Sequence, residues 1–196
     1  DVLLNLQLAL RAGLASTAIH ADRRIGYDRA RAKEGHGLFI NERIPAGGHH
    51  VQDAFLQFLR PLGLEPGPLA WRLPVPAEAR AWAAEKLPGD QPTLLVSPCS
   101  SHPLRNWRPE RYAAVADHAA SRGWRVLLCG GRSQLERETA DAILAAMQSP
   151  AIDLVGQDTL KQLLALLARA SAVLTPDSGP AHMANALGTP VLGLHA

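Results

Sequence analysis

The sequence predicts an α/β protein whose C-terminal half forms a doubly wound parallel sheet. After Pro92, short apolar segments alternate with segments of helical periodicity. Strands that alternate with helices of this length are joined by right-handed crossovers, which give a parallel sheet. Hydrophobic residues make up 47% of the 196 residues and charged residues 19%, so the composition is that of an ordinary globular protein with a sizeable core.

The elements of this pattern can be placed along the chain. We expect strands over residues 93–97, 124–129, 152–155, 172–175 and 191–194, and helices over residues 109–122, 134–147, 160–169 and 181–187. A polar loop follows four of these strands, over residues 97–107, 130–133, 156–158 and 176–182. Because the carboxyl ends of parallel strands lie at one edge of a sheet, these loops are expected to line that edge together, where such sheets bind ligands.

The N-terminal part is less regular. Leu and Ala recur at helical spacing over residues 2–14, a short strand is expected over 17–20, and an amphipathic helix over 49–62 ends at Gly63. Four prolines then exclude a helix and suit a semi-rigid connection; they are Pro66, Pro68, Pro74 and Pro76. We therefore expect a partial N-terminal domain over residues 1–72, a linker and connecting helix over 73–91, and a C-terminal domain over 92–196.

The segment before the last helix has the strongest signal for a ligand site. Asp177, Ser178 and Gly179 form a polar turn, Pro180 suits the first helical position, and His182 follows on the first turn. A helix that begins in this way exposes unpaired N–H groups and the positive end of its dipole, which suits a phosphate or diphosphate. In the alternative, Asp177 or Ser178 is only an N-cap. The convergence of the other loops on this edge favours a binding site.

Two further loops add candidates. Ser100, Ser101 and Arg105 supply hydroxyls and a guanidinium near a helix start, which matches a phosphate-bearing ligand. A capped surface loop explains this composition equally well. Gly130 follows a strand and would bring backbone close to a nucleotide, and Gln134 and Glu136 could bond a ribose. Ordinary turn chemistry is the alternative for the glycine, and a helix N-terminus is the alternative for the other two residues.

Several functional classes are disfavoured. A formal net charge of +2 is too small to argue for a nucleic-acid partner. Cys99 and Cys129 are isolated and the histidines lack metal-ligand spacing, so we expect no protein-held metal. No apolar run approaches the length of a membrane span. The GxGxxG, P-loop and GxSxG patterns are absent, which argues against dinucleotide-binding Rossmann units, ATPases and serine hydrolases.

Two runs of the chain carry a family resemblance, residues 177–182 (DSGPAH) and 186–190 (ALGTP). Together they closely resemble the signature of glycosyltransferase family 9, the ADP-heptose:lipopolysaccharide heptosyltransferases. Residues 105–109 (RNWRP) resemble the family's basic-residue-x-Trp-x-Pro element, and residues 24–28 (RIGYD) resemble a stretch late in its N-terminal domain. The resemblance implies a fold of the GT-B type, with two Rossmann-like, doubly wound parallel-sheet domains, the N-terminal one incomplete here.

The resemblance also implies roles for particular residues. The donor-binding residues would be Ser100, Ser101, Arg105, Gly130, Gln134, Asp177, Ser178, Gly179 and His182. Arg105 stands where the family commonly has a Lys, and Gln134 lies near the position of a ribose-binding acid. A basic cluster of Arg29, Arg31 and Lys33, with His49 and His50, would bind the acceptor. A solvated basic loop explains this cluster equally well.

The reaction that the resemblance implies is inverting sugar transfer from an ADP-sugar to a lipid-linked saccharide acceptor. The chain lacks an initiator Met and ends just after an apolar strand, so we expect a fragment of a longer protein. The family's catalytic base would lie upstream of Asp1, so no catalytic residue is expected in this chain, which alone would have little transferase activity. No tightly bound cofactor is expected, and the location would be cytoplasmic and peripheral, at the inner face of the inner membrane.

Two alternatives stay open at this point. The first is a GT-B transferase or epimerase that uses a UDP-sugar, because the sequence does not fix the nucleotide. The second is a non-catalytic nucleotide-binding or scaffold protein. Titration with ADP and UDP separates these possibilities.

Overall fold

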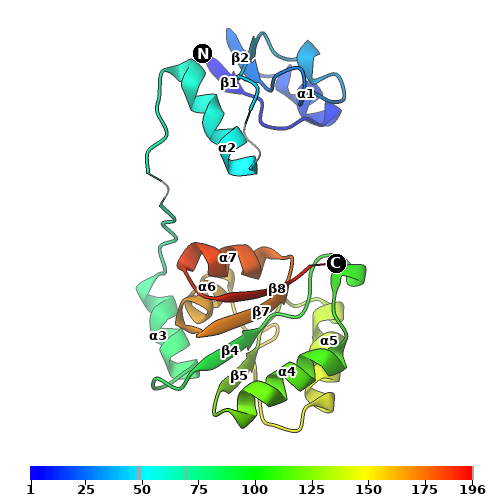
Figure 1. Ribbon diagram of the computed structural model, residues 1–196, viewed down its shortest axis with the longest axis vertical. Helices are drawn as coiled ribbons and strands as arrows, with labels where there is room; N and C mark the ends of the chain where they lie inside the picture. Colours follow the sequence, from blue (N-terminus) through cyan, green and yellow to red (C-terminus); the bar gives the residue numbers. More distant parts are fainter. Residues whose placement is uncertain (48–49, 69, 196) are drawn as a thin grey trace. The chain divides into compact units, whose positions relative to one another are not determined.

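The computed structural model describes residues 1–47, 50–68 and 70–195 of the chain. The chain divides into two compact units, Asp1–Ala70 and Trp71–Ala196, which we call unit 1 and unit 2. Each unit contains a parallel sheet with helices, so both have the α/β class that the sequence predicts. Figure 1 shows the elements of both units along the chain.

Unit 2 is built on a five-stranded sheet in which every neighbouring pair is parallel. Its strands are β4 (Thr93–Val96), β5 (Arg125–Leu128), β6 (Ile152–Asp153), β7 (Ala172–Pro176) and β8 (Val191–Leu194). Their order across the sheet is β6-β5-β4-β7-β8. The chain therefore starts at the central strand, runs outward to one side, and then returns to place β7 on the other side of β4.

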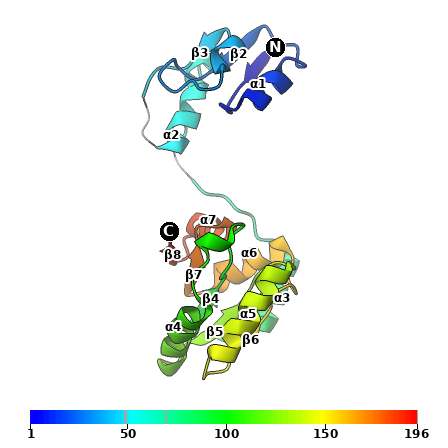
Figure 2. The same ribbon diagram turned by 90° about the vertical axis from the view of Figure 1, so that its right-hand side faces the viewer.

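Helices cover both faces of this sheet (Figures 1 and 2). They are α3 (Ala77–Lys86), α4 (Pro109–Ser121), α5 (Gln134–Ala146), α6 (Leu160–Arg169) and α7 (Gly179–Leu187). Because side chains alternate along a strand, Leu95 packs on one face with residues of α3, α6 and α7. Leu94 and Val96 pack on the other face with residues of α4 and α5. All four residues of β4 are buried, as expected for a central parallel strand.

Unit 1 contains a three-stranded parallel sheet of order β1-β2-β3. Its elements are β1 (Val2–Leu4), α1 (Leu10–Ser16), β2 (Arg23–Gly26), β3 (Glu42–Arg43) and α2 (Val51–Leu56), with 3₁₀ turns η1 (His36–Leu38) and η2 (Gln57–Leu62). A small core holds the unit together. It comprises Ile25, Tyr27, Ile44, Ala54 and Phe58, with Leu8 and Leu62 packed against them.

The prediction of one helix over residues 2–14 and a strand over 17–20 is wrong. Residues 2–4 form β1, whose ladder is continued by a hydrogen bond from the Asn5 N–H to the Ile25 carbonyl. Leu4, Leu6, Leu8 and Leu10 alternate with other residues, a period of two that favours a strand and extended chain. Residues 17–20 form a turn after α1, where the Thr17 hydroxyl donates to the Leu14 carbonyl.

The amphipathic helix expected over residues 49–62 begins later than predicted and changes from an α-helix to a 3₁₀ helix along its length. The α-helix covers Val51–Leu56 and continues as a 3₁₀ turn that contains Pro61, which has no N–H to donate. Gly63 ends it with a φ of 70°, a left-handed conformation that suits glycine, as predicted. Of the apolar stripe, Phe58 is buried but Val51 and Phe55 are exposed.

In the second half the sequence places the elements well. Helix α6 and strand β8 cover the residues predicted for them, and the other predicted strands and helices after Pro92 differ only at their ends. Helix α3, which the sequence assigns to the connection, contributes Ala79 and Ala83 to the core of unit 2. The functional domain limits at residues 72 and 92 stay a prediction.

Candidate functional site

The four polar loops predicted to lie together do meet at the carboxyl edge of the unit 2 sheet. The order of strands reverses between β4 and β7, so the loops after these two neighbours diverge to opposite faces and leave a crevice. Two adjoining cavities open there. They share Cys99, Glu136 and Pro180 in their walls.

The first cavity, which we call the α7 cavity, has a volume of about 490 Å³. It brings together predicted donor residues from two loops, Ser100 and Ser101 after β4 and Asp177, Ser178 and Gly179 after β7. The remaining wall comes from the start of α5 and includes Ser133 and Leu135. Hydroxyls and a helix start therefore face one space, which is the chemistry of a phosphate site.

The second cavity, which we call the Asp158 cavity, has a volume of about 260 Å³. Gly130 and Gly131 form one wall, and the start of α6 supplies Asp158 and two leucines, Leu160 and Leu163. Of the predicted donor residues, only Gly130 lies in its wall. This cavity is smaller than the α7 cavity, and its side chains are mostly apolar except for the carboxylates of Asp158 and Glu136.

The loop after β4 is held in place by hydrogen bonds within its own chain. The Ser100 N–H donates to the Asn106 side chain at 2.7 Å, and the Ser100 hydroxyl donates to the His102 carbonyl at 3.0 Å. The Tyr112 hydroxyl donates to the Pro98 carbonyl, and Trp107 packs edge-on against the Tyr112 ring. Burial raises the pKa of Tyr112 to about 12, so this hydroxyl stays a donor. Trp107 thus packs against the residue that holds this loop.

Glu136 organises the loop after β5. One carboxylate oxygen accepts the Gly131 N–H at 2.6 Å, and the other accepts the Ser133 hydroxyl at 2.6 Å. The Ser133 side chain in turn accepts the Glu136 N–H, which completes a capping box at the start of α5. Gln134, a predicted donor residue, lines neither cavity and donates to Glu138 on its own helix.

The start of α7 lacks such a cap. Helices α5 and α6 each begin with a capping box, whereas the N-cap of α7, Ser178, makes no side-chain hydrogen bond to the helix. Its hydroxyl pairs instead with the Thr175 hydroxyl at 2.9 Å. Gly179 is the first helical residue, so its N–H has no acceptor within the helix. Helix α4 also lacks a side-chain cap, but its first residues line neither cavity.

The other predicted donor residues lie near this edge without lining the cavities. His182 Nε2 is 3.7 Å from an Asp177 carboxylate oxygen, and both side chains are largely exposed to solvent. Arg105 is exposed in the 3₁₀ turn η3 (Pro103–Arg105) of the loop after β4. Both residues are close in sequence to cavity-lining neighbours.

Asp158 is a site residue that sequence reasoning placed in a loop but did not single out. Its Oδ2 atom is buried and finds no hydrogen-bond partner among the residues that the structure describes. Burial raises the pKa of this carboxyl to about 6, with Glu136 adding to the rise and Arg132 opposing it. An acidic residue just before a helix N-cap, after a Gly at a strand end, is the only signal that the sequence offered.

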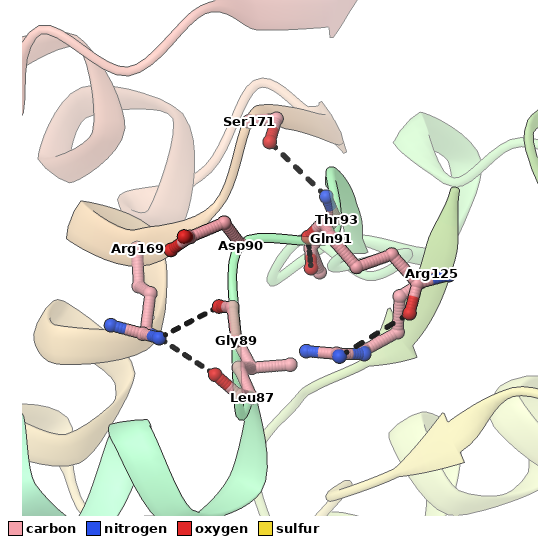
Figure 3. Close-up of a pocket in the computed structure, with 8 residues that line it drawn as sticks. All are labelled: Leu87, Gly89, Asp90, Gln91, Thr93, Arg125, Arg169 and Ser171. Atoms are coloured by element: carbon pink, nitrogen blue, oxygen red, sulfur yellow. Dashed lines mark hydrogen bonds between the residues drawn. The ribbon is translucent and has the colours of Figure 1, made fainter. Parts of the chain in front are cut away.

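A third cavity lies at the opposite, amino edge of the sheet and has a volume of about 220 Å³. Figure 3 shows that its arginines are already engaged, Arg169 with two backbone carbonyls and Arg125 with the Gln91 side chain. Arg169 donates to the carbonyls of Leu87 and Gly89, and Arg125 donates to the Pro88 carbonyl. These bonds fasten the connection between α3 and β4 to the sheet, so this cavity has a structural role.

The basic cluster of unit 1 borders a cavity of about 580 Å³. Arg31, Lys33 and His50 line it, whereas Arg29 does not, and His49 lies outside the described residues. Arg31 is half-buried and is committed to structure, since it forms an ion pair with Asp28 and donates to the Gln57 side chain. Lys33 is exposed.

The described residues give no sign of a metal or membrane segment. Within residues 1–47, 50–68 and 70–195, no cluster of His, Cys, Asp and Glu has the arrangement of a metal site. In the same part of the chain no helix has the length and apolar character needed to cross a bilayer.

Comparison with known proteins decides the family. The model of glycosyltransferase family 9 (heptosyltransferase) matches residues 1–196, the whole of this sequence. The chain belongs to this family. The lipopolysaccharide core heptosyltransferase OpsX of Haemophilus influenzae is 38% identical over 197 residues, which cover 100% of this chain and 57% of the relative. The family 9 chain therefore spans a little over half the length of this curated relative.

Solved structures agree on the fold. A family 9 glycosyltransferase of Veillonella parvula superposes with a TM-score of 0.80 at 24% identity, over 98% of this chain and 56% of that one. The Escherichia coli heptosyltransferase WaaC, solved with ADP-2-deoxy-2-fluoro heptose, gives a TM-score of 0.72 at 21% identity, over 98% of this chain and 60% of that one. The GT-B fold class that the sequence predicts is thereby confirmed.

Asp158→Asn should stabilise the family 9 chain at neutral pH. A carboxyl whose pKa rises from 3.8 to about 6 on folding binds its proton more tightly when folded, so it destabilises the fold increasingly as pH rises through this window. Asparagine removes that cost. Because the residue is partly solvated, we expect the free energy of unfolding to increase by about 1 to 2 kcal/mol at pH 7. Urea denaturation measures it.

The gain should disappear at pH 4, where the wild-type carboxyl is largely protonated in the folded protein. Asp90→Asn, an exposed change at the amino edge, serves as the matched control and should leave stability unchanged at both pH values. A variant at position 158 that is no more stable than wild type at pH 7 would show that this carboxylate is well solvated.

Proposed function

We propose that the protein containing this chain is a glycosyltransferase that moves a heptose, or a similar sugar, from an ADP-sugar to the inner core of lipopolysaccharide. Unit 2 holds the donor, with the diphosphate in the α7 cavity. The observation that carries this proposal is the convergence of Ser100, Ser101 and the uncapped start of α7 on one cavity. Such a cavity offers neutral donors and a positive dipole end to an anion.

The relatives support the choice of donor and acceptor. The family description names heptosyltransferases, and OpsX is named as a lipopolysaccharide core heptosyltransferase. The WaaC structure was solved with an ADP-heptose analogue. These observations favour an ADP-sugar over a UDP-sugar, and an enzyme over a scaffold protein. We propose, as the family resemblance implies, that the protein works peripherally at the inner face of the inner membrane, where a lipid-linked saccharide would be its acceptor.

The chemistry assigned to unit 2 is stabilisation of the leaving diphosphate. In inverting transfer a base removes the proton of an acceptor hydroxyl, the oxygen attacks the anomeric carbon, and the bond to the diphosphate breaks. Negative charge then accumulates on the departing oxygen, where the Gly179 N–H and the α7 dipole stabilise it. We propose that two further residues contact the donor sugar: Asp177, which precedes α7 and lines the α7 cavity, and His182 on the first turn of α7. None of the described residues is assigned as the base.

In unit 1 we propose that Lys33 and Arg31 face the acceptor. Both line the same cavity beside His50, and a cationic wall suits the carboxylates or phosphates of an inner-core saccharide. The structural commitment of Arg31 makes Lys33 the residue whose charge is available to a ligand. Arg29 is exposed and precedes the wall residues Ala30 and Arg31 in the sequence. We propose that it attracts the acceptor only weakly and at longer range.

Gly179→Asp should weaken diphosphate binding without damaging the fold. A side chain at this position meets no atom within 4 Å, and an acid in the first turn suits the helix dipole. The new carboxylate would repel the diphosphate by about 1 to 4 kcal/mol, which weakens ADP binding about fivefold or more. Calorimetric titration of the wild type and the variant with ADP measures this effect.

Adenosine, which carries no phosphate, is the control ligand for this variant. Its affinity should be unchanged, because only the anion is repelled. Equal affinity of the two proteins for ADP would contradict a diphosphate site at the start of α7. Failure of the wild type to bind ADP at all would contradict the proposed function.

Lys33→Ala should weaken binding of the acceptor but leave binding of the donor unchanged. An exposed charge that contacts an anion contributes about 1 kcal/mol, so we expect the KM for the acceptor to rise several-fold in the full-length enzyme. The KM for the ADP-sugar should stay constant. Lys161→Ala, on α6 in unit 2, is the matched control and should leave the acceptor KM unchanged. If the acceptor KM is unchanged in Lys33→Ala, the basic cluster is solvated and does not bind the acceptor.

A further inference from the structure

We infer that the Asp158 carboxylate recognises the exocyclic amino group of adenine and thereby selects the nucleobase of the donor. This inference rests on the proposed function and names the part of the same site that reads the nucleotide. It assigns to Asp158 a specificity-determining contact that neither the sequence motifs nor the family signature contain.

The position of the base follows from the position of the phosphates. The start of α7 opens into the α7 cavity, so a diphosphate bound there can direct the nucleoside into the adjoining space that shares its walls. That space is the Asp158 cavity, whose shared wall residues are Cys99, Glu136 and Pro180. A flat base would lie between the glycines after β5 and the leucines at the start of α6.

The wall residues suit the faces of a base. Gly130 and Gly131 present backbone to this cavity, and the Glu136 carboxylate fills the space where a Cβ of Gly131 would lie. Leu160 and Leu163 lie on the first two turns of α6 and offer apolar surface. Faces of this kind accept any base, and therefore the discrimination must come from a group that meets the edge of the ring.

Asp158 is the group that can do so. Its Oδ2 is buried without a partner in the described chain, although a buried carboxylate oxygen normally accepts a hydrogen bond. The charged groups that act on it from the neighbouring loop are Glu136, which repels it, and Arg132, which attracts it. Neither donates a hydrogen bond to it. A donor brought by the ligand would supply the missing partner.

The number of available oxygen atoms favours adenine over guanine. Among the described residues, Oδ2 is the Asp158 oxygen that is buried without a partner, so the site offers a ligand one desolvated acceptor. Guanine presents two adjacent donors, N1–H and the 2-amino group, which match a carboxylate with both oxygens available. Adenine presents one donor on this edge, its amino group beside the acceptor N1, and therefore needs one carboxylate oxygen. Uracil presents carbonyl oxygens on both sides of its N3–H, and these would face the carboxylate unfavourably.

The test compares nucleotides whose bases differ on this edge. Inosine diphosphate has a carbonyl oxygen in place of the 6-amino group of ADP and a hydrogen on N1, so it keeps the diphosphate, the ribose and the purine shape but exchanges donor and acceptor along the edge. At pH 7.5, calorimetric titration of the protein should show ADP binding at least tenfold more tightly than inosine diphosphate, and also more tightly than GDP and UDP. The carbonyl would leave the buried carboxylate facing another acceptor.

Asp158→Asn should remove this preference. An asparagine amide can turn its NH₂ group toward a carbonyl, so the ratio of the two affinities should fall to about threefold or less. Asp90→Asn, the same chemical change at the amino edge of the sheet, should keep the wild-type ratio. Thermal melting of each variant establishes that it is folded. If Asp158→Asn does not fold, the wild-type comparison of the four nucleotides decides alone.

The outcomes separate this inference from the proposed function. Equal affinity of the wild type for ADP and inosine diphosphate overturns the inference and leaves the diphosphate site standing. The same holds for an unchanged ratio in Asp158→Asn. Tighter binding of GDP than of ADP overturns the choice of adenine. Absence of binding for every nucleotide diphosphate overturns the proposed function and the inference together.

Discussion

The reversal of strand order between β4 and β7 is the constraint on which the site depends. Neighbouring parallel strands whose connections lead to opposite faces leave a crevice at their carboxyl ends, because no crossover covers it. In this chain that crevice receives the loop after β4 and the start of α7. The buried β4, packed through Leu95 on one face and Leu94 on the other, fixes the position of both.

At this edge some polar groups are satisfied by the protein and others are left for a ligand. Glu136 ties the loop after β5, and Asn106 ties the loop after β4, so these walls are formed before any ligand binds. The Gly179 N–H and the Asp158 Oδ2 have no such partner in the chain that the structure describes. One is a donor at a positive helix end and the other a buried acceptor. The fold thereby loses stability at two points that a nucleotide would satisfy.

Sequence reasoning predicted unit 2 well because its signals are local. Alternating apolar and helical segments and Gly or Ser at strand ends located the sheet and the α7 loop, including Ser100, Ser101 and Gly179 in one cavity. It failed at residues 2–14, where leucines of period two also satisfy a loose helical spacing. Asp158 escaped notice because its significance lies in burial and in a missing partner, which only the packed structure reveals.

A crystal structure of the protein with bound ADP is the clearest test of this nucleotide site. We expect the diphosphate against the Gly179 N–H at the start of α7, and the adenine between the loop after β5 and α6 with its amino group toward Asp158. ADP bound at the amino edge, beside Arg125 and Arg169, would contradict it.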